Sequence, residues 1–316
     1  MQGLIPVIGL TPEDRYLHSA TFTFSSSIRQ FIMPLCVGAA IELLPSETRQ
    51  SPESIWRIVQ SKRISVLDLV PSKLATLTTL LENKKPALEK QTLRKVLTAS
   101  EPLGAQLLKR WLALPTNKGC EFLNLYGLTE SAGIVAAHEP DGTQDTGIVP
   151  VGLPIGENRI YILDQDNQPV PTGKPGQICV GGPSIGTTFS AANSRLPMVP
   201  DPGAPGNDLF ATGDLGTCRE DGVIEYKGRL DAQININGLR IQPEEIEAVL
   251  NTLSDIEQGM IIARPTPTGS ILAAMVKLQD GVGGGNASAM PRRIQSSLRK
   301  RLPEYMIPRI VRPVSY

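Results

Sequence analysis

One five-residue segment of this sequence combines the side chains that a nucleotide site needs. Tyr126-Gly127-Leu128-Thr129-Glu130 holds a flat aromatic ring, a conformationally permissive glycine, a hydroxyl and a carboxylate. Such a ring can pack on a base, the hydroxyl can bond a phosphate, and the carboxylate can hold Mg²⁺. A turn with the ring packed inward and with Thr-Glu capping a helix would contain the same residues. The segment by itself leaves both interpretations open.

Two further polar segments lie later in the chain. Thr212-Gly213-Asp214 predicts a polar turn, whose aspartate could accept hydrogen bonds from ribose hydroxyls or could close an ordinary Asx turn. Gly228-Arg229-Leu230-Asp231 lies at the boundary between two regions whose patterns of apolar and polar residues differ. Arg229 could bind a ribose or a phosphate, and Asp231 could be a hinge between domains. A surface ion pair would account for both residues equally well.

The remaining charged groups suggest less chemistry. A basic stretch near the C-terminus faces a single acid, Glu304, which is more typical of a solvated helix face than of a docking patch. Its members are Arg292, Arg293, Arg299, Lys300, Arg301, Arg309 and Arg312. The two histidines, His18 and His138, have no Ser, Cys or carboxylate partner at a useful spacing, so we assign them no catalytic role.

The elements that must hold these residues alternate between strands and helices in the first part of the chain. We expect strands at 39–44, 64–70, 95–99 and 121–125, and helices at 52–62, 72–81 and 104–112. This alternation is typical of a mostly parallel, doubly wound sheet, in which ligands bind beyond the carboxyl ends of the strands. The loops at Pro71-Ser72-Lys73 and Ser100-Glu101-Pro102 occupy that place, together with the segment that follows Leu125.

The pattern changes twice more along the chain. Strands at 160–163, 177–180 and 223–227, with Gly/Pro turns and a long loop at 183–208, predict a β-rich subdomain over about 149–228. Alternation around Asn237-Gly238 then predicts a hairpin. A helix from Pro243 to about Leu253, strands at 260–263 and 271–278, a flexible loop at Gly281–Gly285 and a helix at 289–301 complete the chain. We therefore expect a partial doubly wound α/β domain with this β-rich subdomain over 1–228, and a small α+β domain over 229–316.

Composition excludes several classes of protein. Lys plus Arg equals Asp plus Glu at 31 each, and aromatic residues make up 4% of 316, which argues against nucleic-acid and anionic-membrane partners. No apolar run approaches the ~18 residues of a membrane helix, and the N-terminal segment is a poor signal peptide. The four cysteines are scattered and form no C-x-x-C, so we expect no zinc site but buried, reduced thiols in a cytoplasmic protein.

Six segments, taken in order, closely resemble the core motifs of adenylate-forming enzymes, specifically the adenylation domains of non-ribosomal peptide synthetases. They are LTPEDRYLHSATFTFSSSIRQFIMPLCVGAAIEL (10–43), NLYGLTES (124–131), GQICVGG (176–182), LFATGDL (209–215), GRLDAQININGLRIQPEEIE (228–247) and LPEYMIP (302–308). The resemblance implies that a carboxylate attacks the α-phosphate of Mg-ATP to give acyl-AMP and pyrophosphate. A thiol, usually the phosphopantetheine arm of a carrier protein, then takes the acyl group.

The resemblance also assigns roles, position by position. Asn124 and Tyr126 would line the adenine site, with Gly127, Ser100 and Glu101 also at the cofactor. Thr129 would contact the phosphate and Glu130 would hold Mg²⁺, while Asp214 would hold the ribose with Arg229 nearby. Asp231 would be the hinge about which the small domain swings between the two steps.

The positions that would line the acid-binding pocket carry over as well. They are Ser25, Ser26, Arg29, Ser72, Leu97, Ala99, Leu125, Gly133 and Ile134. Amino-acid-activating members have an aspartate at the position of Ser25, which pairs with the α-ammonium of the substrate. Serine cannot supply that countercharge, so we expect a carboxylic acid without an α-amine. Arg29 could pair with a second carboxylate on the substrate or point to solvent, and we favour solvent.

Two family motifs are missing from this sequence. Nowhere is there a Gly/Ser/Thr-rich phosphate loop followed by lysine, and the sequence stops eight residues after Pro308, before the C-terminal lysine motif. Asn235 and Asn237 also replace the basic residues common in the hairpin. We therefore expect a protein cut at both ends, impaired on its own, that exposes apolar surface. The alternatives are a non-catalytic fragment, half of a split synthetase completed by an N-terminal polypeptide, and an acyl-CoA ligase.

Overall fold

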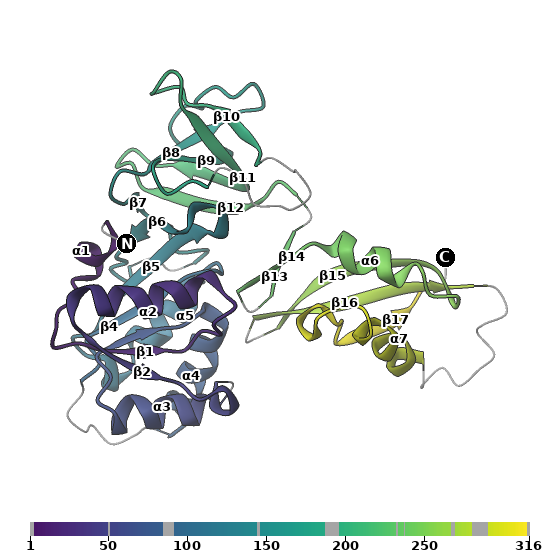
Figure 1. Ribbon diagram of the computed structural model, residues 1–316, viewed down its shortest axis with the longest axis horizontal. Coiled ribbons are helices and arrows are strands. Elements are labelled where there is room, and N and C mark those ends of the chain that lie inside the picture. Colours follow the sequence, from purple (N-terminus) through teal and green to yellow (C-terminus); the bar gives the residue numbers. More distant parts are fainter. Residues whose placement is uncertain are drawn as a thin grey trace. The chain divides into compact units, whose positions relative to one another are not determined.

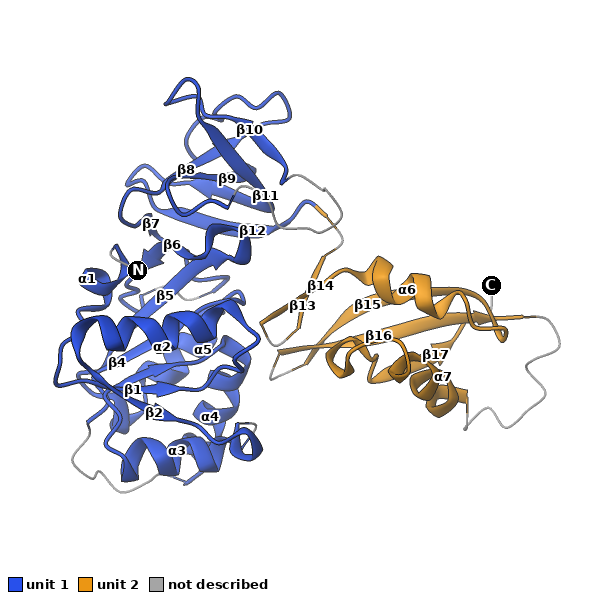
Figure 2. Cartoon of the chain, viewed as in Figure 1, with its two compact units in different colours: residues 1–230 blue, residues 231–316 orange. Residues whose placement is uncertain are grey.

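The structure is a computed structural model (Figure 1). It describes residues 3–49, 51–84, 92–143, 146–186, 196–231, 233–236, 238–266, 269–279 and 290–314. The described residues fall into two compact units, 1–230 and 231–316, so the division lies two residues beyond the expected one (Figure 2). Gly281–Gly285, Asn237 and residue 289 lie outside the described residues.

Unit 1 is built around a mixed sheet with strand order β2-β1-β3-β4-β5-β6-β7 within its described part. The strands are β1 (Arg15–His18), β2 (Ala40–Leu43), β3 (Val66–Asp68), β4 (Lys95–Thr98), β5 (Glu121–Leu128), β6 (Gly133–His138) and β7 (Leu153–Pro154). The pairs from β2 to β5 are parallel, whereas β5–β6 and β6–β7 are antiparallel. The expected α/β fold with a mostly parallel, doubly wound sheet is confirmed.

Helices cover both faces of this sheet because side chains alternate along each strand (Figure 1). They are α1 (Leu4–Ile8), α2 (Ser25–Val37), α3 (Pro52–Ser61), α4 (Pro71–Lys84) and α5 (Ala105–Leu112). Tyr16, Val66, Leu97 and Leu123 form a core with α1 and α2 on one face. Leu17, Leu67, Val96 and Phe122 form a second core with α3, α4 and α5 on the other. Short 3₁₀ turns η1 (Ser46–Thr48) and η2 (Pro115–Asn117) follow β2 and α5.

The start of α3 shows how the local sequence sets a boundary. The hydroxyl of Ser51 accepts a hydrogen bond from the backbone N–H of Ser54 at 3.2 Å, and Pro52 occupies the first turn. A serine cap and a proline at this position together stabilise a helix start. The helix predicted at 52–62 is confirmed.

The β-rich subdomain forms a second sheet, with order β10-β11-β9-β8 and β12 beside β11. Its strands are β8 (Arg159–Leu163), β9 (Gly176–Gly181), β10 (Met198–Pro200), β11 (Asp208–Cys218) and β12 (Ile224–Arg229). The prediction of one long loop at 183–208 was wrong, because β10 lies within it and pairs with β11. The prediction of a turn at Thr212-Gly213-Asp214 was also wrong, since these residues lie inside β11.

Unit 2 is a small α+β fold. Its elements are β13 (Ile234–Ile236), β14 (Leu239–Ile241), α6 (Pro243–Leu250), β15 (Ile256–Thr266), β16 (Gly269–Leu278), α7 (Met290–Arg299), the 3₁₀ turn η5 (Glu304–Met306) and β17 (Ile310–Pro313). The antiparallel pair β13–β14 is the hairpin predicted from the alternation. Helix α6 ends at Leu250, three residues before the expected end. Apolar residues of α6 and α7 pack with those of the β15–β16–β17 sheet in one core.

Helix α2 leaves a row of apolar side chains exposed. Ile28 is 58% exposed and Leu35 is 55% exposed, with Phe31 and Ile32 between them. These residues recur at three- and four-residue spacing, so they share one side of the helix. We call these four side chains the α2 apolar row.

The four cysteines form no disulfide, and all of them lie in the described residues. Cys179 is buried, but Cys36 is exposed and Cys120 and Cys218 are partly exposed, so the prediction of uniformly buried thiols was wrong. Burial raises the pKa of the Cys120 and Cys179 thiols to about 12. Within the described residues, no helix is both long and apolar enough to cross a membrane.

Candidate nucleotide and acid site

Three residues predicted to surround the nucleotide meet in unit 1. The hydroxyl of Tyr126 in β5 donates to Oδ2 of Asp214 in β11 at 2.5 Å. Nη1 of Arg229, the last residue of β12, donates to Oδ1 of the same carboxylate at 2.5 Å. Asp214 is only 5% exposed. We call Tyr126, Asp214 and Arg229 the carboxylate cluster.

A bulge in β11 places Asp214. The register of β11 against β9 shifts between Ala211 and Leu215, and Gly213 takes a φ of +76°, which glycine adopts without strain. The hydroxyl of Thr212 donates to the carbonyl of Ile178 at 2.7 Å and accepts from the backbone N–H of Asp214 at 3.0 Å. The three residues mistaken for a turn therefore form a fixed kink that presents the carboxylate.

The electrostatics of the carboxylate cluster follow from burial. Burial raises the pKa of Tyr126 well above its ordinary value, and the negative charge of Asp214 raises it further. The phenol therefore stays protonated and donates. Arg229 compensates the charge of Asp214, whose carboxylate also accepts from Tyr126 and is thereby held in a fixed orientation. Such an arrangement can hold a ribose.

The segment from Tyr126 to Glu130 is partly strand, and its expected loop geometry was wrong. Strand β5 continues to Leu128 and pairs with β6 in an antiparallel hairpin. A Cβ atom at Gly127 would lie 2.0 Å from the carbonyl oxygen of Gly133, so only glycine fits there. Thr129 and Glu130 follow in the turn η3 (Thr129–Ser131), Thr129 exposed and Glu130 partly exposed.

Glu130 could take part in metal binding in a limited way. In the parts of the chain that the structure describes, no group of three or more His, Cys, Asp or Glu side chains could hold a metal ion. Mg²⁺ in nucleotide sites takes one or two carboxylates and completes its shell with phosphate oxygens and water. A single, partly exposed carboxylate beside a nucleotide fits that role.

The two loops after β3 and β4 contact each other. The carboxylate of Glu101 accepts from the backbone N–H of Ser72 at 2.7 Å and from its hydroxyl at 2.9 Å. This interaction joins a predicted cofactor residue to a predicted acid-pocket residue at the start of α4. Ser100 has a φ of +71°, in the left-handed region. Burial lowers the pKa of the neighbouring Lys73.

Asn124 lies deeper than the other predicted cofactor residues. Its side-chain amide donates to the carbonyl of Pro150 at 2.8 Å, and its side-chain oxygen accepts from the hydroxyl of Thr98 at 3.3 Å. These hydrogen bonds tie β5 to β4 and to the segment before β7. In this structure Asn124 supports the wall of the site.

The predicted acid-pocket residues fall into a buried apolar group and a group nearer the surface. Leu97, Ala99 and Leu125 are buried in one core cluster, and Ile134 packs against it. Gly133, which begins β6, is partly exposed beside Ile134. Ser25 is exposed and Ser26 is partly exposed in the first turn of α2.

The expectation that Arg29 points to solvent was wrong. Arg29 is 5% exposed and forms an ion pair with Asp68, the last residue of β3, which is 2% exposed. The sequence around Arg29 gives no sign of this ion pair, because Arg29 and Asp68 are 39 positions apart in the chain. Asp68 is therefore a residue of the candidate site that sequence reasoning missed.

His18 also has a partner that its sequence spacing did not reveal. Its Nε2 shares a hydrogen bond with the hydroxyl of Ser27 at 2.9 Å, while its Nδ1 is buried without a partner in the described residues. Its ring stacks on Phe22 with centroids 4.6 Å apart. Burial lowers the pKa of His18, so the imidazole stays neutral at pH 7. The hydrogen bond to Ser27 joins the end of β1 to the start of α2.

In unit 2, Asp231 is the first residue, and its carboxylate accepts from the backbone N–H of Gln233 at 3.2 Å. The basic C-terminal stretch has more than one acidic neighbour, contrary to expectation. Arg299 pairs with Glu304, and Arg293 pairs with Asp255. These exposed ion pairs fit a solvated helix face.

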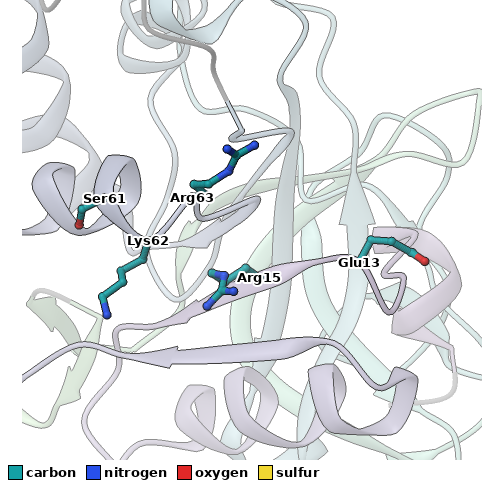
Figure 3. A pocket seen from close by; sticks show the side chains of 5 residues that line it. All are labelled: Glu13, Arg15, Ser61, Lys62 and Arg63. Carbon is teal, nitrogen blue, oxygen red and sulfur yellow. The ribbon is translucent and has the colours of Figure 1, made fainter.

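A separate surface pocket lies away from all these residues. Glu13, Arg15, Ser61, Lys62 and Arg63 line it (Figure 3). Arg15 begins β1, and Lys62 and Arg63 precede β3, so the pocket lies at the amino ends of the parallel strands. The predicted site residues follow the carboxyl ends of the same strands.

Comparisons with known proteins agree with the motifs and the fold. The family model described as "AMP-binding enzyme" matches residues 1–189, and "AMP-binding enzyme C-terminal domain" matches 245–315. The polyketide synthase PksN of Bacillus subtilis (strain 168) is 30% identical over 303 residues, which are 95% of this chain and 5% of that protein. Tyrocidine synthase 1 of Brevibacillus parabrevis is 30% identical over 305 residues, which are 95% of this chain and 26% of that protein.

Solved structures share the fold. IdnL1 matches with a TM-score of 0.80 and 22% identity, covering 100% of this chain and 64% of that one. NpsA-ThdA, an artificially fused adenylation–PCP di-domain NRPS from Klebsiella oxytoca, matches with a TM-score of 0.79 and 21% identity, covering 97% and 58%. The chain thus spans only part of each relative. Its resemblance to adenylation domains is confirmed, and the chain belongs to the AMP-binding enzyme family.

Proposed function

We propose that this chain binds ATP and a carboxylic acid and contributes to forming an acyl-adenylate. The observation that carries the proposal is the carboxylate cluster, because a buried, charge-compensated carboxylate held in a fixed orientation suits the hydroxyls of a ribose. Asp214 would accept from the ribose hydroxyls, and Tyr126 and Arg229 would fix its orientation. Thr129 would contact the α-phosphate. Catalysis would then consist mainly of positioning and of neutralising phosphate charge.

Mg²⁺ would neutralise phosphate charge when bound, and Glu130 is the residue proposed to hold it. Its position in η3, directly after the strand that carries Tyr126, supports this role. The acyl group would pass to the phosphopantetheine thiol of an acyl or peptidyl carrier protein, in non-ribosomal peptide or polyketide synthesis. The similarity to the polyketide synthase PksN and to an adenylation–PCP di-domain NRPS supports that partner. A cytoplasmic location stays a prediction.

The acid is proposed to lack an α-amine. Ser25 supplies no negative charge where amino-acid-activating members place an aspartate. A partly desolvated ammonium needs a countercharge, so the absence of one at this position disfavours amino acids. Asp231 is the proposed hinge for movement of unit 2, a role supported by its place as the first residue of that unit.

A second candidate function is supported by the α2 apolar row. The chain would then be one half of a split synthetase, or a binding module without turnover, whose partner polypeptide covers that row. Side chains such as Ile28 and Leu35, more than half exposed, are typical of interaction surfaces when they are contiguous.

The two functions differ in what the purified chain does with Mg-ATP and a panel of carboxylic acids. Acyl-AMP detected by mass spectrometry would support adenylation by the chain alone, and the identity of the acid would test the argument from Ser25. AMP binding without any acyl-AMP would favour the split enzyme. Asp214→Asn should weaken AMP binding, whereas the exposed Asp221→Asn should not. Equal AMP binding by both variants would refute the role of the carboxylate cluster.

A further inference from the structure

Glu101 holds the first turn of α4 from a different loop. Its Oε2 accepts from the backbone N–H of Ser72 at 2.7 Å, and its Oε1 accepts from the Ser72 hydroxyl at 2.9 Å. The helix begins at Pro71, and the first N–H groups of a helix have no partner within the helix. In α3 such a partner is local, since Ser51 lies three residues before the N–H from which it accepts. Glu101 follows β4 and lies 29 positions after Ser72, so this contact fixes α4 to the end of β4.

The end of β4 is also fixed to the strand that carries Tyr126. Strand β4 ends at Thr98, whose register partner in β5 is Asn124. The hydroxyl of Thr98 donates to the side-chain oxygen of Asn124 at 3.3 Å. Asn124 precedes Tyr126 of the carboxylate cluster by two residues in β5. In the sheet, β4 therefore lies between the strand of the proposed nucleotide site and the strand that leads to α4.

Only two residues separate these two attachments, and the second of them is Ser100. Ser100 has a φ of +71°, a left-handed conformation that residues other than glycine adopt at a cost in free energy. Such a conformation persists where the surrounding structure fixes it. The Thr98–Asn124 hydrogen bond lies before Ser100, and the two Glu101–Ser72 hydrogen bonds lie after it. A segment this short, held at both ends, has little freedom to absorb a movement, so it transmits order from one end to the other.

We propose that Glu101 is a positioning residue that couples the nucleotide site to the acid site through the first turn of α4. The inference rests on the proposed function, in which the nucleotide binds at the carboxylate cluster, and on the predicted place of Ser72 at the acid site. A nucleotide that orders β5 and the end of β4 also orders the first turn of α4, and so fixes Ser72 before the acid binds. Coupling between two ligands is reciprocal, so the acid strengthens nucleotide binding by the same factor.

Hydrogen exchange of the backbone amides of α4 tests the proposal without knowledge of the acid. Exchange is measured by mass spectrometry on the full chain, with and without AMP at a concentration that saturates binding. AMP should slow exchange in the first turns of α4 by about fivefold or more, which is the lower end of typical coupling between sites. The quantity compared is the ratio of the two exchange rates. A residue that only stabilises the helix changes both rates by the same factor and leaves this ratio unchanged.

Four variants isolate the two hydrogen bonds. Glu101→Ala removes both acceptors and should abolish the effect of AMP on α4. Glu101→Gln should keep the effect, because its amide oxygen accepts from the Ser72 N–H and its NH₂ group donates to the hydroxyl. Ser72→Ala loses only the hydroxyl and should lose part of the effect, which provides a test if Glu101→Ala does not fold. The matched control is Ser51→Ala, which removes the cap of α3 and should leave the effect on α4 unchanged. Thermal unfolding checks that each variant is folded.

The outcomes separate this inference from the proposed function. If AMP binds and slows exchange in β5 but not in α4, the coupling role of Glu101 is overturned and the nucleotide site stands. The same holds if folded Glu101→Ala or Ser72→Ala keeps the full effect, or if Ser51→Ala loses it. If calorimetry detects no binding of AMP to the unmodified chain, the proposed function itself is overturned, and this inference with it.

Discussion

Tyr126→Phe removes a single hydroxyl from the carboxylate cluster and gives a sharp test of its energetics. The hydroxyl donates to Asp214 at 2.5 Å in a partly buried setting, and hydrogen bonds to charged groups contribute about 1.5–3 kcal/mol to stability. We expect the free energy of unfolding of unit 1 to fall by that amount at pH 8. Trp56 and Trp111 are the only tryptophans in the chain, and both are buried in unit 1. Urea unfolding followed by tryptophan fluorescence therefore reports on unit 1 alone.

The same variant should behave differently at alkaline pH. The pKa of Tyr126 is raised in the folded state above its unfolded value of about 10. Above pH 10 the unfolded chain loses this proton while the folded chain keeps it, so the stability contributed by Tyr126 falls as pH rises. The slope is about 1.4 kcal/mol per pH unit, and the variant lacks this contribution. The difference between the two proteins should therefore shrink above pH 10.

Tyr161→Phe in β8 is the matched control, since the Tyr161 hydroxyl makes no hydrogen bond with the described residues. It should change stability little at either pH. A Tyr126→Phe protein as stable as the wild type at pH 8 would refute the energetic reasoning. A stability difference that stays constant up to pH 11 would refute the assignment of the raised pKa to Tyr126.

Three further predictions follow from other features. Gly127→Ala would force a Cβ atom against the Gly133 carbonyl, so we expect the free energy of unfolding, measured in urea, to fall by about 3 kcal/mol or more. An unchanged urea midpoint would contradict the hairpin geometry. Replacing Ile32 and Leu35 of the α2 apolar row by Gln should reduce self-association measured by light scattering. Unchanged self-association would show that another surface of the protein causes it. A thiol reagent at pH 8 should modify the exposed Cys36 first and the buried Cys179 only on unfolding. If Cys179 of a folded Cys36→Ala variant were modified rapidly, its burial and its raised pKa would be contradicted.

The sequence was most informative where local patterns decide structure. Short apolar runs between helical patterns predicted β3, β4 and β5, and Ser51-Pro52 predicted the start of α3. Regular strands and capped helices depend on neighbours in the chain, so their signals are local. Motif order then assigned Tyr126, Asp214 and Arg229 to one nucleotide, and the structure brings these three residues together.

The failures share a different physical cause. Thr212-Gly213-Asp214 has the composition of a turn, but pairing with β9 and β12 holds it within a strand and confines the irregularity to a bulge. Arg29 looks like a solvent-facing residue until Asp68 arrives from a strand 39 residues away. His18 likewise meets Ser27 only because the loop before α2 folds back on β1. In each case a contact between residues far apart in the chain overrides the local structural preference. A single sequence does not show which distant residues meet.

The position of Arg229 bears on how this protein could be recombined with its relatives. Arg229 and Asp214 are register partners in β12 and β11, and the division between the two units follows at Leu230. A crossover after Leu230 would take all three residues of the carboxylate cluster from the same parent. A crossover two residues earlier would combine Asp214 from one parent with the arginine of another. An exchange of small domains between this protein and its relatives would therefore keep the cluster intact only if it joined the chains after Arg229.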